Sequence, residues 1–212
     1  MVKYEKQRIY FNEKDFIEIN VEILSRREKL FRNILNKKNK LDKLLYYTEN
    51  QEVKMFYEFL KKEYSISKVY YPACGVDITP AMVFDEVIML DNDKSVFNNI
   101  RIQNGGPFLR KKLNKMRLIV SDYKNFKPPE DIQLVIGINS FSNISDLHNL
   151  IPKGVYIIAN NHFYLANNIN KAVKKRDYDY IGLLTETGIN ESSYEETLKF
   201  VKNESYWLFK KL

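Results

Sequence analysis

Short apolar runs separated by polar segments characterise the chain from about residue 66 onward. Each run has the length of a strand, and the segments between them carry helical spacing or turn residues. The runs lie at residues 68–73, 87–90, 118–120, 134–138 and 155–159. Alternating strand and helix signals are typical of a parallel sheet covered on both faces. We therefore predict an α/β fold with a mostly parallel sheet.

The first 65 residues have a longer hydrophobic period, which predicts helices. Apolar residues share helix faces in the sets Ile17, Val21 and Leu24, and Val53, Phe56, Tyr57 and Leu60. Many basic residues lie between them at positions 26–43, and this basic face is either solvated or docks an acidic partner. We predict an N-terminal helical extension, residues 1–65, and an α/β core, residues 66–212. At the end of the core, residues 180–184 and 206–209 predict an antiparallel hairpin.

Composition and charge exclude several classes of protein. The chain has 212 residues, and its net charge of +7 fits either RNA binding or simple solubility. One cysteine and two histidines argue against a Cys/His zinc site. Carboxylate metal sites stay open, but no calcium-loop spacing is present, and we expect no metal. Neither a P-loop nor a G-x-G-x-x-G motif is present. No apolar run suits a membrane span or a signal peptide, so we expect a cytoplasmic protein without a membrane partner.

A glycine and an aspartate lie at the ends of the first two predicted strands of the core. Gly75 follows the first strand in a turn, and Asp91 ends the second strand. In an open α/β sheet, ligands bind beyond the carboxyl ends of the strands, so these groups share one edge. A glycine lets the backbone approach a ligand, and a carboxylate accepts hydrogen bonds from both hydroxyls of a ribose. The spacing therefore predicts a site for a nucleoside-shaped cofactor.

The charge of the turn narrows the choice of cofactor. Dinucleotide folds place a pyrophosphate against the start of a helix, but here the turn carries Asp77, which would repel phosphate. A cofactor with an amino-acid tail suits the turn better, because its ammonium group is attracted to a carboxylate. S-adenosylmethionine has this structure.

Residues 66 to about 165 resemble a class I S-adenosylmethionine-dependent methyltransferase. The order and intervals of five segments match that family, which implies a Rossmann-like, doubly wound sheet. The resemblance places cofactor-binding residues at the glycine-rich motif, at the ribose-binding acid and near the adenine: Tyr71, Pro72, Ala73, Cys74, Gly75 and Asp77, then Asp91 and Asn92, then Asp122 and Tyr123. The sequence departs from the family where Tyr71 replaces the usual acid and where Ala73 and Asp77 replace glycines.

Several of these residues also have structural interpretations. Cys74 suits a tight turn as a small residue, better than it suits a nucleophile. Asp91 can cap the helix that starts near residue 94, a role that Asp93 fills equally well. Asp122 can cap a turn.

The resemblance implies a methyltransferase whose acceptor is a small molecule or RNA. Asn139 and His162 follow the fourth and fifth strands of the core, so we expect them nearest the substrate, with Asn139 orienting the acceptor and His162 acting as a base. No N-P-P-[YF] tetrapeptide follows the fourth strand, which argues against an adenine-N6 enzyme. Two alternatives stay open: a non-catalytic binding or scaffold protein, and an enzyme that transfers the aminocarboxypropyl group of the same cofactor.

Overall fold

The computed structural model describes residues 2–10, 16–23, 51–75, 77–98, 116–138, 148–160, 177–185, 188–193, 196 and 206–212. The strands are β1 (Tyr4–Tyr10), β2 (Phe16–Glu22), β3 (Lys68–Pro72), β4 (Glu86–Asp91), β5 (Met116–Val120), β6 (Leu134–Gly137), β7 (Tyr156–Asn160), β8 (Tyr178–Thr185), β9 (Gly188–Asn190) and β10 (Tyr206–Lys211). The helices are α2 (Gln51–Glu63), α3 (Thr79–Val83), α4 (Lys94–Asn98) and a 3-10 turn, η1 (Tyr123–Asn125).

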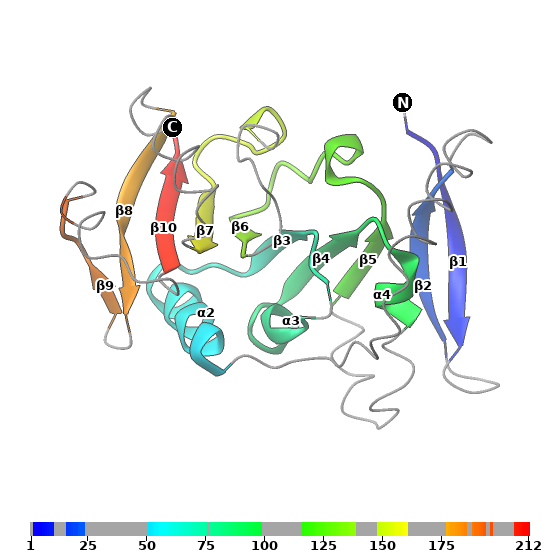
Figure 1. The fold of residues 1–212 in the computed structure, drawn as a ribbon, viewed down its shortest axis with the longest axis horizontal. Coiled ribbons are helices and arrows are strands. Elements are labelled where there is room, and N and C mark those ends of the chain that lie inside the picture. Colours follow the sequence, from blue (N-terminus) through cyan, green and yellow to red (C-terminus); the bar gives the residue numbers. More distant parts are fainter. Residues whose placement is uncertain are drawn as a thin grey trace.

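The described strands form one sheet in the order β1-β2-β5-β4-β3-β6-β7-β10-β8-β9 (Figure 1). Neighbours from β2 to β7 are parallel, whereas β10 is antiparallel to both β7 and β8. The chain leaves β3 toward β4 and β5 on one side, then returns to β6 and β7 on the other. Because the strand order reverses beside β3, the carboxyl ends of β3, β4 and β6 surround a topological switch point, where such sheets bind ligands.

The core has two layers because successive residues of a strand point to opposite faces. On one face, Val69 and Tyr71 of β3 join a cluster that includes Tyr57 and Leu60 of α2. On the other face, Tyr70 joins a separate cluster with Ile88, Leu90, Phe126 and Ile151. Helices α2, α3 and α4 lie along the first face, and all three contribute residues to its cluster (Figure 1).

The predicted strands of the core are confirmed to within two residues at each end. They read as continuous apolar runs because both faces are buried, and β6 has no exposed residue. Helix α2 is also confirmed, and its predicted apolar face, from Val53 to Leu60, is buried. The expected strands at 180–184 and 206–209 lie within β8 and β10, which are antiparallel neighbours.

The prediction of helices at the N-terminus is wrong for residues 4–10 and 16–22. These two segments form an antiparallel pair of strands, β1 and β2, which we call the N-terminal hairpin, and β2 continues the main sheet by pairing with β5. Ile17 and Val21 are four residues apart, a spacing that suits a helix face and equally one face of a strand. Ile19, completely buried, completes the strand pattern of alternate apolar residues. Leu24 lies outside the described residues, as do the basic positions 26–43.

The acidic partner expected at the N-terminal helices has no support, because the basic residues on which it rested lie outside the described ranges. The division of the chain at residue 65 stays a prediction, although β2 and the core strands share a sheet. None of the described helices combines the length and apolar character that crossing a bilayer requires.

If β2 belongs to the main sheet, truncating its buried side chain will destabilise the whole fold. We expect Ile19→Ala to lower the free energy of unfolding by about 2–4 kcal/mol, since it deletes a fully buried aliphatic side chain. The matched control is Ile23→Ala, whose side chain is 49% exposed and whose loss will cost under about 0.5 kcal/mol. Urea denaturation measures both values. Equal, small effects of the two substitutions would contradict the placement of β2.

Candidate functional site

The turn after β3 brings its backbone against the end of β4. Ala73 and Gly75 both have left-handed backbone conformations, with φ of 50° and 55°. Between them, the Cys74 N–H donates to the Leu90 carbonyl at 3.0 Å. For Gly75 this conformation is free of strain, whereas Ala73 carries a Cβ and is held there at a cost of about 1–2 kcal/mol. The turn is therefore held by its hydrogen bonds to β4.

Asp91 fastens this turn to the second core strand. One carboxylate oxygen accepts from the Gly75 N–H at 3.0 Å, and the other accepts from the Asp93 N–H at 2.9 Å. Burial raises the pKa of Asp91 above its ordinary value of 3.8, and the nearby charge of Asp93 adds to this, while the backbone N–H groups oppose it. Asp91 thus lies at the C-terminal edge of the sheet, next to the turn, as predicted.

The helix-capping role considered for Asp91 belongs to Asp93. The Asp93 side chain accepts from the Ser95 N–H at 2.8 Å, and its carbonyl accepts from the Val96 N–H at 3.1 Å, at the start of α4. Asn92, between the two acids, is exposed at the same edge. The carboxylate of Asp91 is therefore not needed to start the helix.

Asp77, in the same turn, forms a compact polar group with Tyr71 and Thr79. One oxygen of Asp77 accepts from the N–H and hydroxyl of Thr79, at 2.9 and 2.5 Å. The other oxygen accepts from the Tyr71 hydroxyl at 3.2 Å. Burial raises the pKa of Asp77 above 3.8, although these three hydrogen bonds lower it. The two residues that depart from the family pattern at positions 71 and 77 therefore bind each other.

Cys74 has the structural role that its surroundings suggest. Its side chain is buried, and burial raises the pKa of the thiol, with the charges of Asp91 and Asp77 adding to the effect. A thiol with a raised pKa stays protonated and is a poor nucleophile near neutral pH. Its small volume fits the tight turn.

Asp122 and Tyr123 follow β5 at the same edge as Asp91. In the register between the strands, Asp91 pairs with Val120, and the Ser121 N–H donates to the Asp91 carbonyl at 2.9 Å. Asp122 accepts from the Lys124 N–H at 2.9 Å and so caps η1, as its alternative interpretation predicted. Both residues are half-buried, so they can also contact a ligand.

The structure thus brings together ten predicted cofactor residues on three consecutive strand ends. They are Tyr71, Pro72, Ala73, Cys74, Gly75, Asp77, Asp91, Asn92, Asp122 and Tyr123. The two predicted catalytic residues, Asn139 and His162, lie outside the described residues, directly after Ile138 and close after β7.

Sequence reasoning missed two residues of this region, Tyr57 and Glu22. The hydroxyl of Tyr57 is buried close to Tyr71 and Asp77, and burial raises its pKa. Glu22 is a buried acid at the end of β2 that accepts from Ser121. Strict alternation of apolar and polar residues at positions 17–23 was the signal that could have placed Glu22 at a strand end.

Comparison with solved structures identifies the fold. A methyltransferase from Geobacter sulfurreducens is 14% identical over 90% of this chain and 92% of the other, with a TM-score of 0.52. A Pyrococcus horikoshii protein, provisionally identified as an RNA methyltransferase, is 17% identical over 89% of this chain and 100% of the other, with a TM-score of 0.50. The methyltransferase domain of bacterial CtHen1-C is 12% identical over 77% of this chain and 99% of the other, also at 0.50.

No protein-family model and no curated protein matches the sequence. At these identities the likeness concerns the fold, and it agrees with the strand order and the switch point described above. The chain therefore has the fold of the class I S-adenosylmethionine-dependent methyltransferases, at 12–17% sequence identity to these three structures.

Proposed function

We propose that the protein is a methyltransferase that uses S-adenosylmethionine and holds its ribose with Asp91. The observation that carries this proposal is the hydrogen bond from the Gly75 N–H to the Asp91 carboxylate. It joins the turn after β3 to the end of β4 at the switch point of the sheet, where open α/β sheets bind nucleosides.

The carboxylate of Asp91 has capacity for a ribose. An ionised carboxylate has about four lone-pair sites. The N–H groups of Gly75 and Asp93 occupy one site on each oxygen. The remaining sites suit two neighbouring hydroxyl groups, which donate, and Asn92 lies exposed next to them.

The turn itself has room for a ligand. Among the residues that the structure describes, none has an atom within 4 Å of a Cβ added to Gly75, apart from the immediate chain neighbours, so the backbone there is open toward them. The positive φ of Gly75 nevertheless favours glycine, because L side chains rarely adopt it. Bare backbone beside open space suits the close approach of a flat or extended ligand, with Pro72, Ala73 and Cys74 shaping the same turn.

Asp77 gives the turn the charge that an amino-acid tail requires. Its carboxylate would repel a pyrophosphate and attract an ammonium group. Tyr71 stands where the family keeps an acid, and the Tyr71 hydroxyl donates to Asp77 at 3.2 Å. We infer that Asp77 supplies the negative charge from a different position of the same turn, and that Asp122 and Tyr123 take the adenine side.

The methyl group of S-adenosylmethionine is already activated by its sulfonium, so the protein has mainly to position the acceptor and remove a proton. Asn139 would orient the acceptor by hydrogen bonding, and His162 would act as the base. Both residues follow parallel strands, β6 and β7, whose carboxyl ends lie at the same edge of the sheet as the proposed site. The acceptor is a small molecule or RNA. The Pyrococcus horikoshii neighbour and the net charge of +7 make RNA the first acceptor to test.

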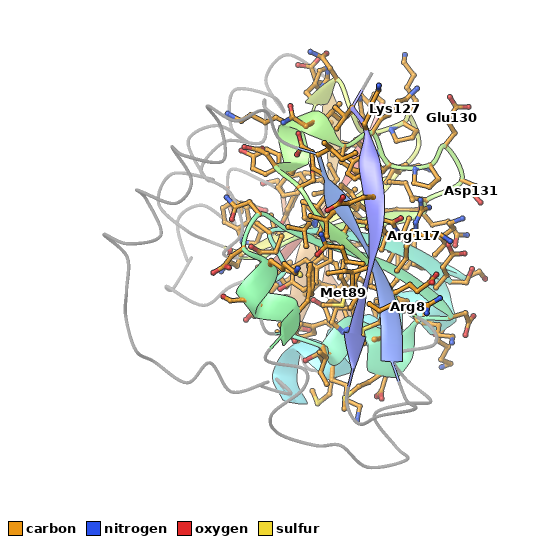
Figure 2. The ribbon with its side chains drawn as sticks, turned by 90° about the vertical axis from the view of Figure 1, so that its right-hand side faces the viewer. Arg8, Met89, Arg117, Lys127, Glu130 and Asp131 are labelled. Atoms are coloured by element: carbon orange, nitrogen blue, oxygen red, sulfur yellow. The ribbon has the colours of Figure 1, made fainter. Side chains whose placement is uncertain are left out.

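Direct binding tests the proposal. We expect S-adenosylmethionine and S-adenosylhomocysteine to bind in titration calorimetry, and Asp91→Ala to weaken binding at least about tenfold, since it removes hydrogen bonds to a charged acceptor. The control is Asp131→Ala, at the opposite edge of the sheet, where Asp131 pairs with Lys68 at 2.8 Å. Figure 2 shows Asp131 on the outside of the molecule, near Glu130. The control variant will bind like the parent.

Two results would redirect the proposal. Absence of heat and of a thermal shift at millimolar ligand would favour a non-catalytic binding protein. If the parent binds and turns over, product analysis separates methyl transfer from transfer of the aminocarboxypropyl group. An Asp91→Ala protein that binds as well as the parent would overturn the ribose assignment.

The raised pKa of Asp91 predicts how binding depends on pH. The ionised carboxylate accepts hydrogen bonds from the ribose, whereas the protonated form loses acceptor sites. Burial raises the pKa above 3.8. Affinity for S-adenosylhomocysteine will therefore be constant above the raised pKa and will fall as pH decreases through it, starting at a higher pH than for an exposed aspartate. Calorimetry at several pH values measures this.

Asp77, whose pKa is also raised, will act in the same direction. In Asp91→Asn the affinity will be lower at neutral pH and the remaining pH dependence will be that of Asp77. For stability the sign is the reverse: protonation of Asp91 or Asp77 favours the folded state, so their contribution to stability grows as pH falls through their raised pKa values. Identical pH profiles for parent and Asp91→Asn would contradict the assignment.

A further inference from the structure

The N-terminal hairpin brings a buried carboxylate to the edge of the proposed site. Strand β2 pairs in parallel with β5, with Asn20 opposite Ile119 and Val21 opposite Val120 (Figure 1). In this register Glu22, the last residue of β2, is level with Ser121, the first residue after β5. Glu22 is 9% exposed and Ser121 is completely buried. Figure 2 looks directly onto this hairpin.

Glu22 uses both carboxylate oxygens on the segment after β5. The Ser121 hydroxyl lies 2.8 Å from one oxygen and donates to it. The Asn125 side-chain amide donates to the other at 3.3 Å. From β1, the Tyr4 hydroxyl lies 3.4 Å from the Ser121 hydroxyl oxygen, and the Tyr4 ring packs edge-on against Phe126. Both strands of the hairpin therefore contact this segment.

The two partners of Glu22 enclose the turn that carries Asp122 and Tyr123. Ser121 precedes the turn, and Asn125 ends it. Within the turn, the Asn125 N–H donates to the Asp122 carbonyl at 3.0 Å, and the Lys124 N–H donates to the Asp122 carboxylate at 2.9 Å. Movement of either end would change where the Asp122 carboxylate points.

A carboxylate is a costly choice for a purely structural contact. Taking a charged group out of water is unfavourable unless hydrogen bonds replace its hydration. Elsewhere β2 covers β5 with Ile19, an apolar residue. A charged acceptor instead forms stronger and more directional hydrogen bonds than a neutral group. A carboxylate that bonds to both ends of a turn can hold the turn in one position.

We propose that Glu22 is a positioning residue that sets the nucleobase-contacting turn of residues 122–125 through Ser121 and Asn125. The inference rests on the proposed function, in which Asp122 lies on the adenine side of the cofactor. Glu22 acts through the turn and does not itself touch the ligand. In this arrangement the hairpin determines base selectivity, since the Asp122 carboxylate accepts from the exocyclic amine of adenine and repels the oxygen of hypoxanthine.

The test compares two ligands that differ only in the base: S-adenosylhomocysteine and S-inosylhomocysteine. We expect Glu22→Ala to weaken binding of the adenine ligand about tenfold, as expected for lost hydrogen bonds to a charged group, and the hypoxanthine ligand far less. The ratio of the affinity for the adenine ligand to that for the hypoxanthine ligand will therefore decrease. Glu22→Gln keeps one oxygen acceptor for Ser121 but loses both the charge and the acceptor for the Asn125 amide, so its affinity for the adenine ligand will lie between those of Glu22→Ala and the parent. Equal weakening of both ligands would show a merely structural role and overturn the proposal.

The matched control lies on the same strand. Glu18 of β2 is exposed and pairs with Lys6 and Arg8 of β1, far along the hairpin from the turn. Glu18→Ala will leave both affinities unchanged. Ser121→Ala removes the donor of the hydrogen bond that Glu22→Ala removes as acceptor. The double variant will therefore bind S-adenosylhomocysteine no more weakly than the weaker-binding single variant. Fully additive losses would contradict the coupling.

Hydrogen exchange separates this inference from the proposed function, because it needs no ligand. In the full chain, Glu22→Ala will speed amide exchange at Lys124 and Asn125, whose N–H groups bond to Asp122, while Glu18→Ala will not. If Glu22→Ala speeds this exchange although the parent binds neither ligand, the positioning role is supported and only the assignment of the cofactor is lost. Unchanged exchange would overturn the inference even if the parent binds S-adenosylhomocysteine.

Discussion

The hydrogen bond between the Gly75 N–H and the Asp91 carboxylate joins the two strand ends on which the site depends. It is possible because β3 and β4 are parallel and in register, with Pro72 opposite Leu90, so both strands end at one level. The turn that follows β3 contains two left-handed residues, one of them Ala73. Two hydrogen bonds to β4, from Cys74 and Gly75, offset the cost of that conformation. Within the described part of the chain, no atom beyond the chain neighbours lies within 4 Å of a Cβ added at Gly75.

Two residues that depart from the family's sequence pattern bind each other in the structure. Tyr71 and Asp77 each look like the loss of a motif residue, yet their side chains are bonded at 3.2 Å. Thr79 completes the group with two hydrogen bonds to the other carboxylate oxygen. Burial raises the pKa of this carboxylate, while the three donors favour its charged form and oppose the shift. A changed motif can therefore keep an acidic group in the turn.

The N-terminal hairpin extends the sheet and reaches the site. Its strand β2 covers β5, which would otherwise be the edge of the parallel core. Through Glu22 and Tyr4 it contacts the turn after β5. One addition to the fold thus serves stability, through Ile19, and the placement of polar groups, through Glu22.

The sequence alone determined the core strands, helix α2 and the positions of the acids at strand ends. Short apolar runs and a helical period over residues 53–60 depend on neighbouring residues, so local pattern was sufficient. Tertiary structure decided the rest. The spacing of Ile17 and Val21 fits a helix and a strand equally well, and only the pairing of β2 with β5 shows that they belong to a strand. In the sequence, Asp91 and Asp93 are equally suited to cap the helix. The structure shows that Asp93 caps it and that Asp91 accepts from the Gly75 N–H. Glu22 acquired its partners from residues 99 and 103 positions away. Contacts over such separations leave no local period, because they depend on how strands are ordered in the sheet and not on the residues beside them.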